Sequence, residues 1–153
     1  MAITIETARP ADADEIAGLI STNHLPLDGL REHLDTAVVA RLNGKVVGVA
    51  ALEVYKDGVL MRSVAVAPAL HGQGLGHLLT NAVLQLARDL EAPHAYLLTT
   101  TAEEFFPKFG FERIERADVP ASVQASIEFR SACPASAIVM RKVLSSTVGS
   151  ERL

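Results

Sequence analysis

The chain has 153 residues, a common size for one domain with its own core, and its 49% apolar and 21% charged residues exclude a disordered chain. Its apolar runs are too short for a membrane-spanning helix, and its first residues do not have the pattern of a secretory signal peptide. A net charge of −4 without a Lys/Arg run argues against nucleic-acid binding, and one cysteine without paired Cys/His spacing argues against a metal site. We expect one cytoplasmic domain over residues 1–144, a flexible tail at 145–153, no metal, and no membrane partner.

The chain begins with a predicted strand and two predicted helices. Residues 3–8 alternate between apolar and polar side chains, as in a strand with one face on the core. Asp12 is a suitable N-cap, and the helix that it opens should continue to about Ser21. A second, shorter helix is expected over residues 27–34.

A hairpin and a central strand are predicted next. Asn43 and Gly44 both tolerate positive φ, so they indicate a two-residue turn between strands at 37–42 and 45–55. Residues 59–66 are apolar at nearly every position, which is typical of a strand covered on both faces.

The second half of the sequence alternates helices with strands. From residue 74 to residue 90 the apolar positions recur every three or four residues, which predicts an amphipathic helix. Thr101 and Glu104 form a capping-box pattern for a short helix that Pro107 should keep brief. The remaining predicted segments are strands at 95–100, 111–114 and 137–143 and a short helix at 120–127.

A glycine-rich turn connects the central strand to the amphipathic helix. In His71–Gly76 the glycines allow successive N–H groups to converge, and the helix N-terminus adds partial positive charge, which predicts a pyrophosphate cradle. The glycines alone leave open a turn that binds nothing. A Rossmann dinucleotide site fits less well, because the strand before the glycines follows a hairpin.

Two motifs in register make the chain resemble the GNAT superfamily over nearly its whole length. Residues 105–111 match the family's short helix that ends in Gly-Phe. The family's nucleotide motif is Arg/Gln-x-x-Gly-x-Gly/Ala, and it follows a Val-x-Val strand and a proline. In this chain the first position of that motif is His71 instead of Arg or Gln. The other matched positions of that motif are Val64-Ala65-Val66, Pro68, Gly74 and Gly76. The resemblance implies an α/β GNAT fold, with a central mixed, mostly antiparallel sheet of about seven strands flanked by helices, and acetyl-CoA as co-substrate.

The resemblance also implies which residues hold the cofactor. Val64 and Val66 would pair their backbone with the pantetheine amides, and the glycine turn would hold the pyrophosphate. The implied cofactor residues are Val64, Ala65, Val66, Gly72, Gln73, Gly74, Leu75, Gly76 and His77. Many members of the family place a tyrosine, as acid for the departing thiolate, where this chain has Phe106, so here the thiolate would leave to water, to another donor, or unassisted.

A narrower resemblance is carried by residues 128–137, Met140, residues 97–101 and Glu53 ahead of Tyr55. These residues are similar to those of acetyltransferases associated with arsenic resistance. That branch implies direct acetyl transfer to the primary amine of a small amino-acid-like or arsenical metabolite.

Four side chains are candidates for catalysis or acceptor binding: Glu53, Arg62, Arg130 and Ser131. Glu53 is the candidate base, and the alternative is a solvated edge glutamate. Arg62 shares the parity of Val64 and Val66 and would face the acceptor, unless it forms a structural ion pair. Arg130, followed by Ser131, could bind an acceptor carboxylate with two parallel hydrogen bonds, unless it forms a surface salt bridge.

The predicted function is therefore acetyl-CoA-dependent N-acetyl transfer to a small-molecule amine. Cys133 is expected to be a small core residue rather than a nucleophile, because no histidine is adjacent in sequence. Two alternatives stay open: an acyl-CoA-binding regulatory module with little turnover, and a protein lysine or N-terminal acetyltransferase. A homodimer is also possible.

Overall fold

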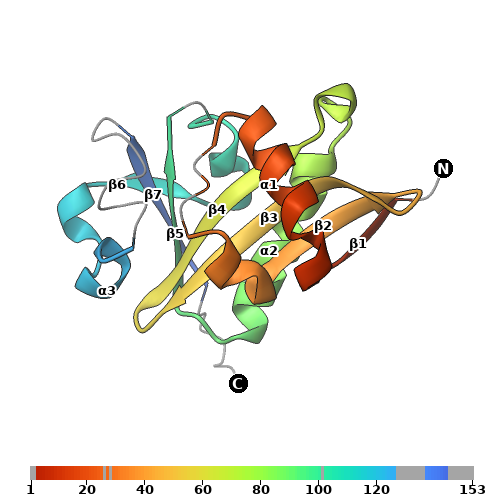
Figure 1. Ribbon diagram of the computed structural model, residues 1–153. Coiled ribbons are helices and arrows are strands. Elements are labelled where there is room, and N and C mark those ends of the chain that lie inside the picture. Colours follow the sequence, from red (N-terminus) through yellow and green to blue (C-terminus); the bar gives the residue numbers. More distant parts are fainter. Residues whose placement is uncertain (1–2, 26, 28, 101, 127–136, 145–153) are drawn as a thin grey trace, which may run out of the picture. The chain divides into compact units, whose positions relative to one another are not determined.

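The computed structural model describes residues 3–25, 27, 29–100, 102–126 and 137–144 (Figure 1). The seven strands form one sheet in the order β1-β2-β3-β4-β5-β7-β6, with helices outside it. The strands are β1 (Ile3–Thr7), β2 (Ala37–Leu42), β3 (Lys45–Tyr55), β4 (Gly58–Val66), β5 (His94–Thr99), β6 (Glu112–Ile114) and β7 (Ile138–Val143). The α-helices are α1 (Ala13–Thr22), α2 (Leu75–Asp89) and α3 (Ala121–Gln124). The 3-10 helices cover Pro10–Asp12, Arg31–Thr36, Pro68–Leu70, Phe106–Phe109 and Arg116–Asp118.

The chain divides into two compact units that share β3 and β4. The first unit comprises Met1–Glu53 and Met61–Gln85, and the second comprises Val54–Leu60 and Leu86–Leu153.

In the first unit, the faces of β2 and β3 pack against different helices. β1 pairs antiparallel with β2, and β2 pairs antiparallel with β3. Ile16 and Ile20 of α1 share a buried cluster with Val39 and Val49. On the other face Gly48 faces α2, where an added Cβ would lie 2.6 Å from Leu79 Cδ1. The alternation of side chains along each strand therefore supplies both layers of this core.

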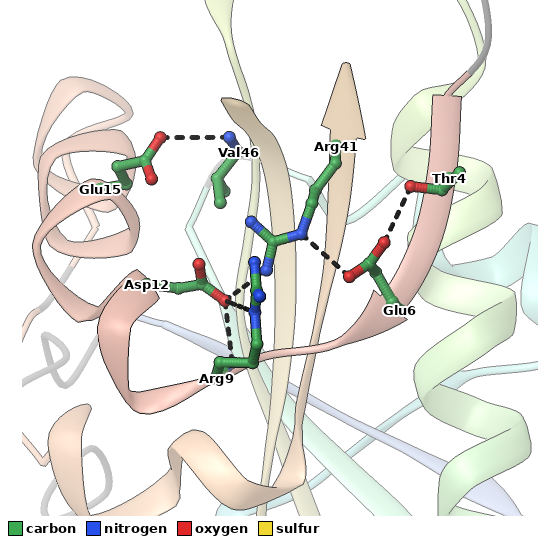
Figure 2. A network of polar contacts seen from close by, with 7 residues as sticks. All are labelled: Thr4, Glu6, Arg9, Asp12, Glu15, Arg41 and Val46. Carbon is green, nitrogen blue, oxygen red and sulfur yellow. Dashed lines mark hydrogen bonds and ion pairs between the residues drawn. The ribbon is translucent and has the colours of Figure 1, made fainter. Parts of the chain in front are cut away.

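A polar network ties β1 and the start of α1 to β2 (Figure 2). Arg41 of β2 donates to Glu6 Oε1 at 3.0 Å and to Asp12 Oδ2 at 2.5 Å, and the Arg9 N–H donates to the same Asp12 oxygen at 2.8 Å. The Arg41 guanidinium holds the pKa of Asp12 below its usual range. Asp12 does precede α1, as predicted, but its side chain makes no cap bond to the helix because Arg41 and Arg9 engage it.

The second unit is built on β5. The first residues of β4 run parallel to β5, with Val59 opposite Ala95 and Leu60 opposite Tyr96. β7 pairs antiparallel with β5 and also with β6. Leu60 and Tyr96 pack with Val119, Val123 and Val139 in one buried cluster. The sheet is thus mixed and mostly antiparallel, as the sequence predicted.

The predicted hairpin turn and long helix are confirmed. Two of the three predicted short helices are 3-10 helices, whereas the one expected over 120–127 contains the α-helix α3. Asn43 and Gly44 have φ values of 54° and 81°, the left-handed geometry that the two-residue hairpin requires. The helix expected over 27–34 is a 3-10 helix over Arg31–Thr36, with residues 26 and 28 outside the described part. The helix before Gly110 is only a 3-10 turn, Phe106–Phe109, because Pro107 lacks the N–H that a longer helix needs.

Candidate active site

The end of β4 directs the backbone polar groups of Val64 and Val66 away from β3. The Ala67 N–H donates to the Val47 carbonyl of β3 at 2.8 Å. In an antiparallel pair the bonding direction alternates from one residue to the next, so Val64 and Val66 direct their N–H and C=O groups to the opposite side. This segment can therefore pair with an extended ligand that carries amides.

The glycine turn after β4 adopts the conformation that its composition predicts. A 3-10 helix over Pro68–Leu70 leads into Gly72 and Gly74, both with φ of 82°, and α2 begins at Leu75. A Cβ at either glycine would meet nothing within 4 Å, so the constraint there is backbone conformation and the surrounding space is open. The predicted residues 72–77 thus lie together at the N-terminus of a 15-residue helix.

Two side chains converge on the carbonyl oxygen of Val66. His71 Nε2 lies 2.7 Å from this oxygen, and because a carbonyl only accepts, the Nε2 atom must carry the donated proton. Asn23, at the end of α1, donates to the same oxygen at 3.2 Å and to the Leu19 carbonyl at 2.9 Å. The histidine that replaces Arg or Gln in the nucleotide motif therefore folds back onto β4.

Glu53 and Arg62 form a buried ion pair between β3 and β4. Arg62 Nη1 donates to Glu53 Oε2 at 2.7 Å, and the side chains are 0% and 1% exposed. The alternative of a solvated edge glutamate is wrong, because the Glu53 side chain is buried. Arg62 Nε also donates to Ser63 Oγ at 3.0 Å, and Ser63 has a φ of 60° that interrupts the regular strand.

His33 is a neighbour of this ion pair that the sequence analysis missed. Its Nε2 lies 3.9 Å from Glu53 Oε1, and its side chain is 26% exposed. The Thr36 hydroxyl fixes this segment by donating to the carbonyls of His33, at 3.2 Å, and Leu52, at 2.5 Å. No local motif marks His33, because its approach to Glu53 depends on how the segment before β2 packs on the end of β3.

The described residues contain no group of three His, Cys, Asp or Glu side chains arranged to hold a metal ion. Among the helices of the described part, none is both long and apolar enough to cross a membrane.

Comparisons with known proteins identify the family. Residues 33–113 match the sequence family described as acetyltransferase (GNAT) domain. The chain belongs to the GNAT acetyltransferase family.

Individual GNAT relatives extend this match over most of the chain. The Mycobacterium tuberculosis protein Rv2747, solved in complex with CoA and NLQ, is 32% identical, with 93% of this chain and 99% of that one covered and a TM-score of 0.78. An N-acetylglutamate synthase from Neisseria gonorrhoeae, solved with coenzyme A and N-acetyl-glutamate, is 21% identical, with 95% and 36% covered and a TM-score of 0.81, which concerns the fold alone.

This chain covers less than half of each of two longer curated relatives. An amino-acid acetyltransferase from Mycobacterium tuberculosis is 46% identical over 83 residues, which are 54% of this chain and 47% of that protein. One from Aeromonas salmonicida is 28% identical over 131 residues, 78% of this chain and 30% of that protein. The chain therefore spans about half or less of the curated relatives that it matches.

Phe106, which the resemblance places where many family members have a tyrosine, packs in the second unit. Its side chain is buried, and its ring centroid lies 5.1 Å from that of Phe105 and 5.9 Å from that of Phe111, both in edge contacts. Phe109 and Phe111 are buried, whereas Phe105 is half-buried. Phe105 borders an open pocket of about 490 Å³, whose other lining residues are Thr100, Ala102, Glu103, Glu104 and Lys108.

Three residues singled out in the sequence have no described position. Arg130, Ser131 and Cys133 lie outside the described residues, as does Thr101 of the predicted capping box. The described first unit brings together the backbone of β4, the glycine turn and the pair of Glu53 with Arg62. The roles predicted for all these residues stay predictions.

Proposed function

We propose that this chain transfers the acetyl group of acetyl-CoA to the primary amine of a small amino acid. The observation that carries the proposal is the order of two features along the chain. The backbone polar groups of Val64 and Val66 face away from β3, and the left-handed glycines Gly72 and Gly74 follow them just before α2. The strand can pair with the two pantetheine amides, and the N–H groups of residues 72–77 can bind the pyrophosphate. The CoA complex of Rv2747 supports this choice of cofactor.

The chemistry that we propose is direct transfer. The acceptor ammonium loses one proton, the neutral amine attacks the thioester carbonyl, and the C–S bond breaks as the amide forms. The nitrogen gives up a second proton to water, and the CoA thiolate takes a proton from water and leaves as the thiol. Water is the proton donor because Phe106 has no proton to donate. A thiol has an ordinary pKa of about 8.5, so its thiolate is a tolerable leaving group without a dedicated acid. Cys133 has no part in this route.

Glu53 is the group that we propose as the base. Arg62 holds its Oε2, while Oε1 lies 3.9 Å from Nε2 of the more exposed His33. Because 3.9 Å is beyond direct hydrogen-bond distance, we propose that a proton taken up at this carboxylate reaches solvent through one bridging water and His33. The Arg62 ion pair keeps the carboxylate in one orientation inside an apolar unit.

We propose a free amino acid as acceptor, because two relatives are named amino-acid acetyltransferases. Arg130, with Ser131 beside it, is the proposed partner of the acceptor's carboxylate, since a guanidinium binds a carboxylate with two parallel hydrogen bonds. An arsenical amino acid presents the same amine and would enter the same site. The cytoplasmic location and the homodimer stay predictions.

The test of this function is an acceptor panel. CoA release from acetyl-CoA is followed with a thiol reagent in the presence of free amino acids, an arsenical amino acid or a lysine-containing peptide, and the products are weighed by mass spectrometry. We expect N-acetylated amino acid. Stoichiometric CoA binding without turnover on any amine would favour the regulatory module, and turnover on the peptide alone would favour a protein acetyltransferase.

Three variants assign the roles within the same assay. Glu53→Gln should lower kcat by about 10²- to 10⁴-fold at unchanged CoA affinity if Glu53 is the base. Arg130→Ala should raise KM for the acceptor and leave KM for acetyl-CoA unchanged, with Arg130→Lys recovering only part of the loss. Melting temperatures of all three variants separate these effects from loss of folding.

A further inference from the structure

The carbonyl oxygen of Val66 already receives two hydrogen bonds in the structure. His71 Nε2 lies 2.7 Å away and Asn23 Nδ2 lies 3.2 Å away. A backbone carbonyl has two acceptor lone pairs, so these two donors account for its acceptor capacity. Under the proposed function, however, an amide N–H of pantetheine would also bond to this oxygen.

The two donors differ in how readily they can leave. Asn23 uses the same nitrogen to bond the Leu19 carbonyl at 2.9 Å, so both of its N–H groups are engaged and it holds the end of α1. His71 lies on an exposed loop, between the 3-10 helix Pro68–Leu70 and Gly72. Its imidazole can be rehydrated when it moves outward, whereas releasing Asn23 would break a helix-end contact as well.

We propose that His71 closes the edge of β4 in the absence of cofactor and that the pantetheine amide of acyl-CoA displaces it from the Val66 carbonyl. This inference rests on the proposed function and names a residue that opposes cofactor binding within it. One acceptor position is exchanged, because the hydrogen bond from His71 breaks and a hydrogen bond from the pantetheine amide N–H forms in its place. Asn23 stays in place and keeps its hydrogen bonds to the Val66 and Leu19 carbonyls.

The glycine turn gives His71 room to leave. Gly72 follows it directly, and apart from each glycine and its two chain neighbours no described atom lies within 4 Å of the position that a Cβ on Gly72 or Gly74 would take. The backbone can therefore adjust next to His71 without a clash. Because the same turn forms the proposed pyrophosphate site, the exchange at Val66 is expected to accompany binding of the phosphates a few residues along.

The decisive experiment compares two probes on His71→Ala and His71→Gln. CoA carries the pantetheine, whereas 3′-phospho-ADP contains only the nucleotide half of CoA. Removing a competing hydrogen bond should make CoA bind about two- to tenfold more tightly to His71→Ala. The affinity for 3′-phospho-ADP should stay unchanged. His71→Gln keeps a side-chain N–H donor and should behave like wild type.

Asn23→Ala provides an independent arm. It also vacates one acceptor position on Val66, so CoA should again bind more tightly, and the double variant with His71→Ala should gain no more than the better single variant. Urea unfolding of each variant confirms that the compared proteins are folded.

The outcomes separate the two proposals. If His71→Ala weakened both CoA and 3′-phospho-ADP, His71 would organise the phosphate turn and the displacement would be wrong. Unchanged CoA affinity in a folded His71→Ala would also overturn it. If wild type bound no CoA at all, the proposed function itself would fail, and the displacement with it.

Discussion

At the residue scale, two buried arginines each face a carboxylate from another segment of the chain. Arg62 on β4 meets Glu53 on β3, and Arg41 on β2 meets Asp12 ahead of α1. Burying a single charge without a partner is costly, so each pair fixes which segments lie together. Removing one member of the Arg62 and Glu53 pair should cost about 3–5 kcal/mol, because it leaves the other charge inside the unit.

Asp12 makes the first unit sensitive to acid. The hydrogen bond from Arg41 lowers the pKa of Asp12, so the unfolded chain binds this proton more readily than the folded protein does. The stabilisation is therefore complete above the unfolded value of about 3.9 and is lost as the pH falls through the lower folded value. Asp12→Asn should reduce the free energy of unfolding at pH 7 by about 1–3 kcal/mol, and the difference from wild type should shrink below about pH 4.

Urea titrations between pH 2 and pH 7 measure this difference. Asp14→Asn is the matched control, because Asp14 pairs with Arg31 through a side chain that is 95% exposed, and it should change stability little. An Asp12→Asn difference that stayed constant down to pH 2 would mean that the carboxylate charge does not contribute.

At the element scale, features that depend on residues adjacent in sequence could be predicted. The Asn43-Gly44 turn and the brief helix at Pro107 depend on local backbone preferences, and both are confirmed. The contacts of His33 with Glu53 and of Asp12 with Arg41 could not be predicted. They join residues far apart in sequence, and many other pairings of charged residues would have fitted the same sequence.

The orientation of Arg62 could not be predicted from the alternation of side chains along the strand alone. Arg62, Val64 and Val66 alternate in sequence, which suggested a common face, but Ser63 lies between them with a φ of 60°. A positive φ in a residue other than glycine is uncommon and breaks the two-residue period of the strand. The orientation of Arg62 is therefore set by its bonds to Glu53 and Ser63 rather than by the alternation that describes Val64 and Val66.

Gly74 allows the phosphate cradle to be tested with a matched pair of variants. Asp and Asn have nearly the same shape, and both tolerate the left-handed conformation that Gly74 adopts, so they differ mainly in charge. Gly74→Asp should weaken CoA binding by about ten- to a hundredfold, because its carboxylate would repel the pyrophosphate. Gly74→Asn should bind CoA nearly as wild type does. Calorimetry measures both affinities, and equal losses in the two variants would mean that backbone strain, not charge, is responsible.

At the scale of the whole molecule, the two compact units share two continuous strands. β3 passes from the first unit to the second between Glu53 and Val54, and β4 returns between Leu60 and Met61. The residues proposed to bind CoA and to take up the proton lie in the first unit, whereas the Phe106 position lies in the second. The single domain predicted from the sequence requires that neither unit be stable without the other.

Unfolding followed by two signals tests this requirement. Both tyrosines, Tyr55 and Tyr96, belong to the second unit and the chain has no tryptophan, so intrinsic fluorescence reports that unit. All of α1 and most of α2 belong to the first unit, so circular dichroism reports mainly that one. Because β3 and β4 would lose their hydrogen bonds in both units at once, we expect the two urea transitions to coincide. CoA at 100 times its Kd should then stabilise both signals equally, by about 2.7 kcal/mol. A fluorescence midpoint that differed from the dichroism midpoint, or that did not respond to CoA, would show that the units unfold separately and that the chain is two domains.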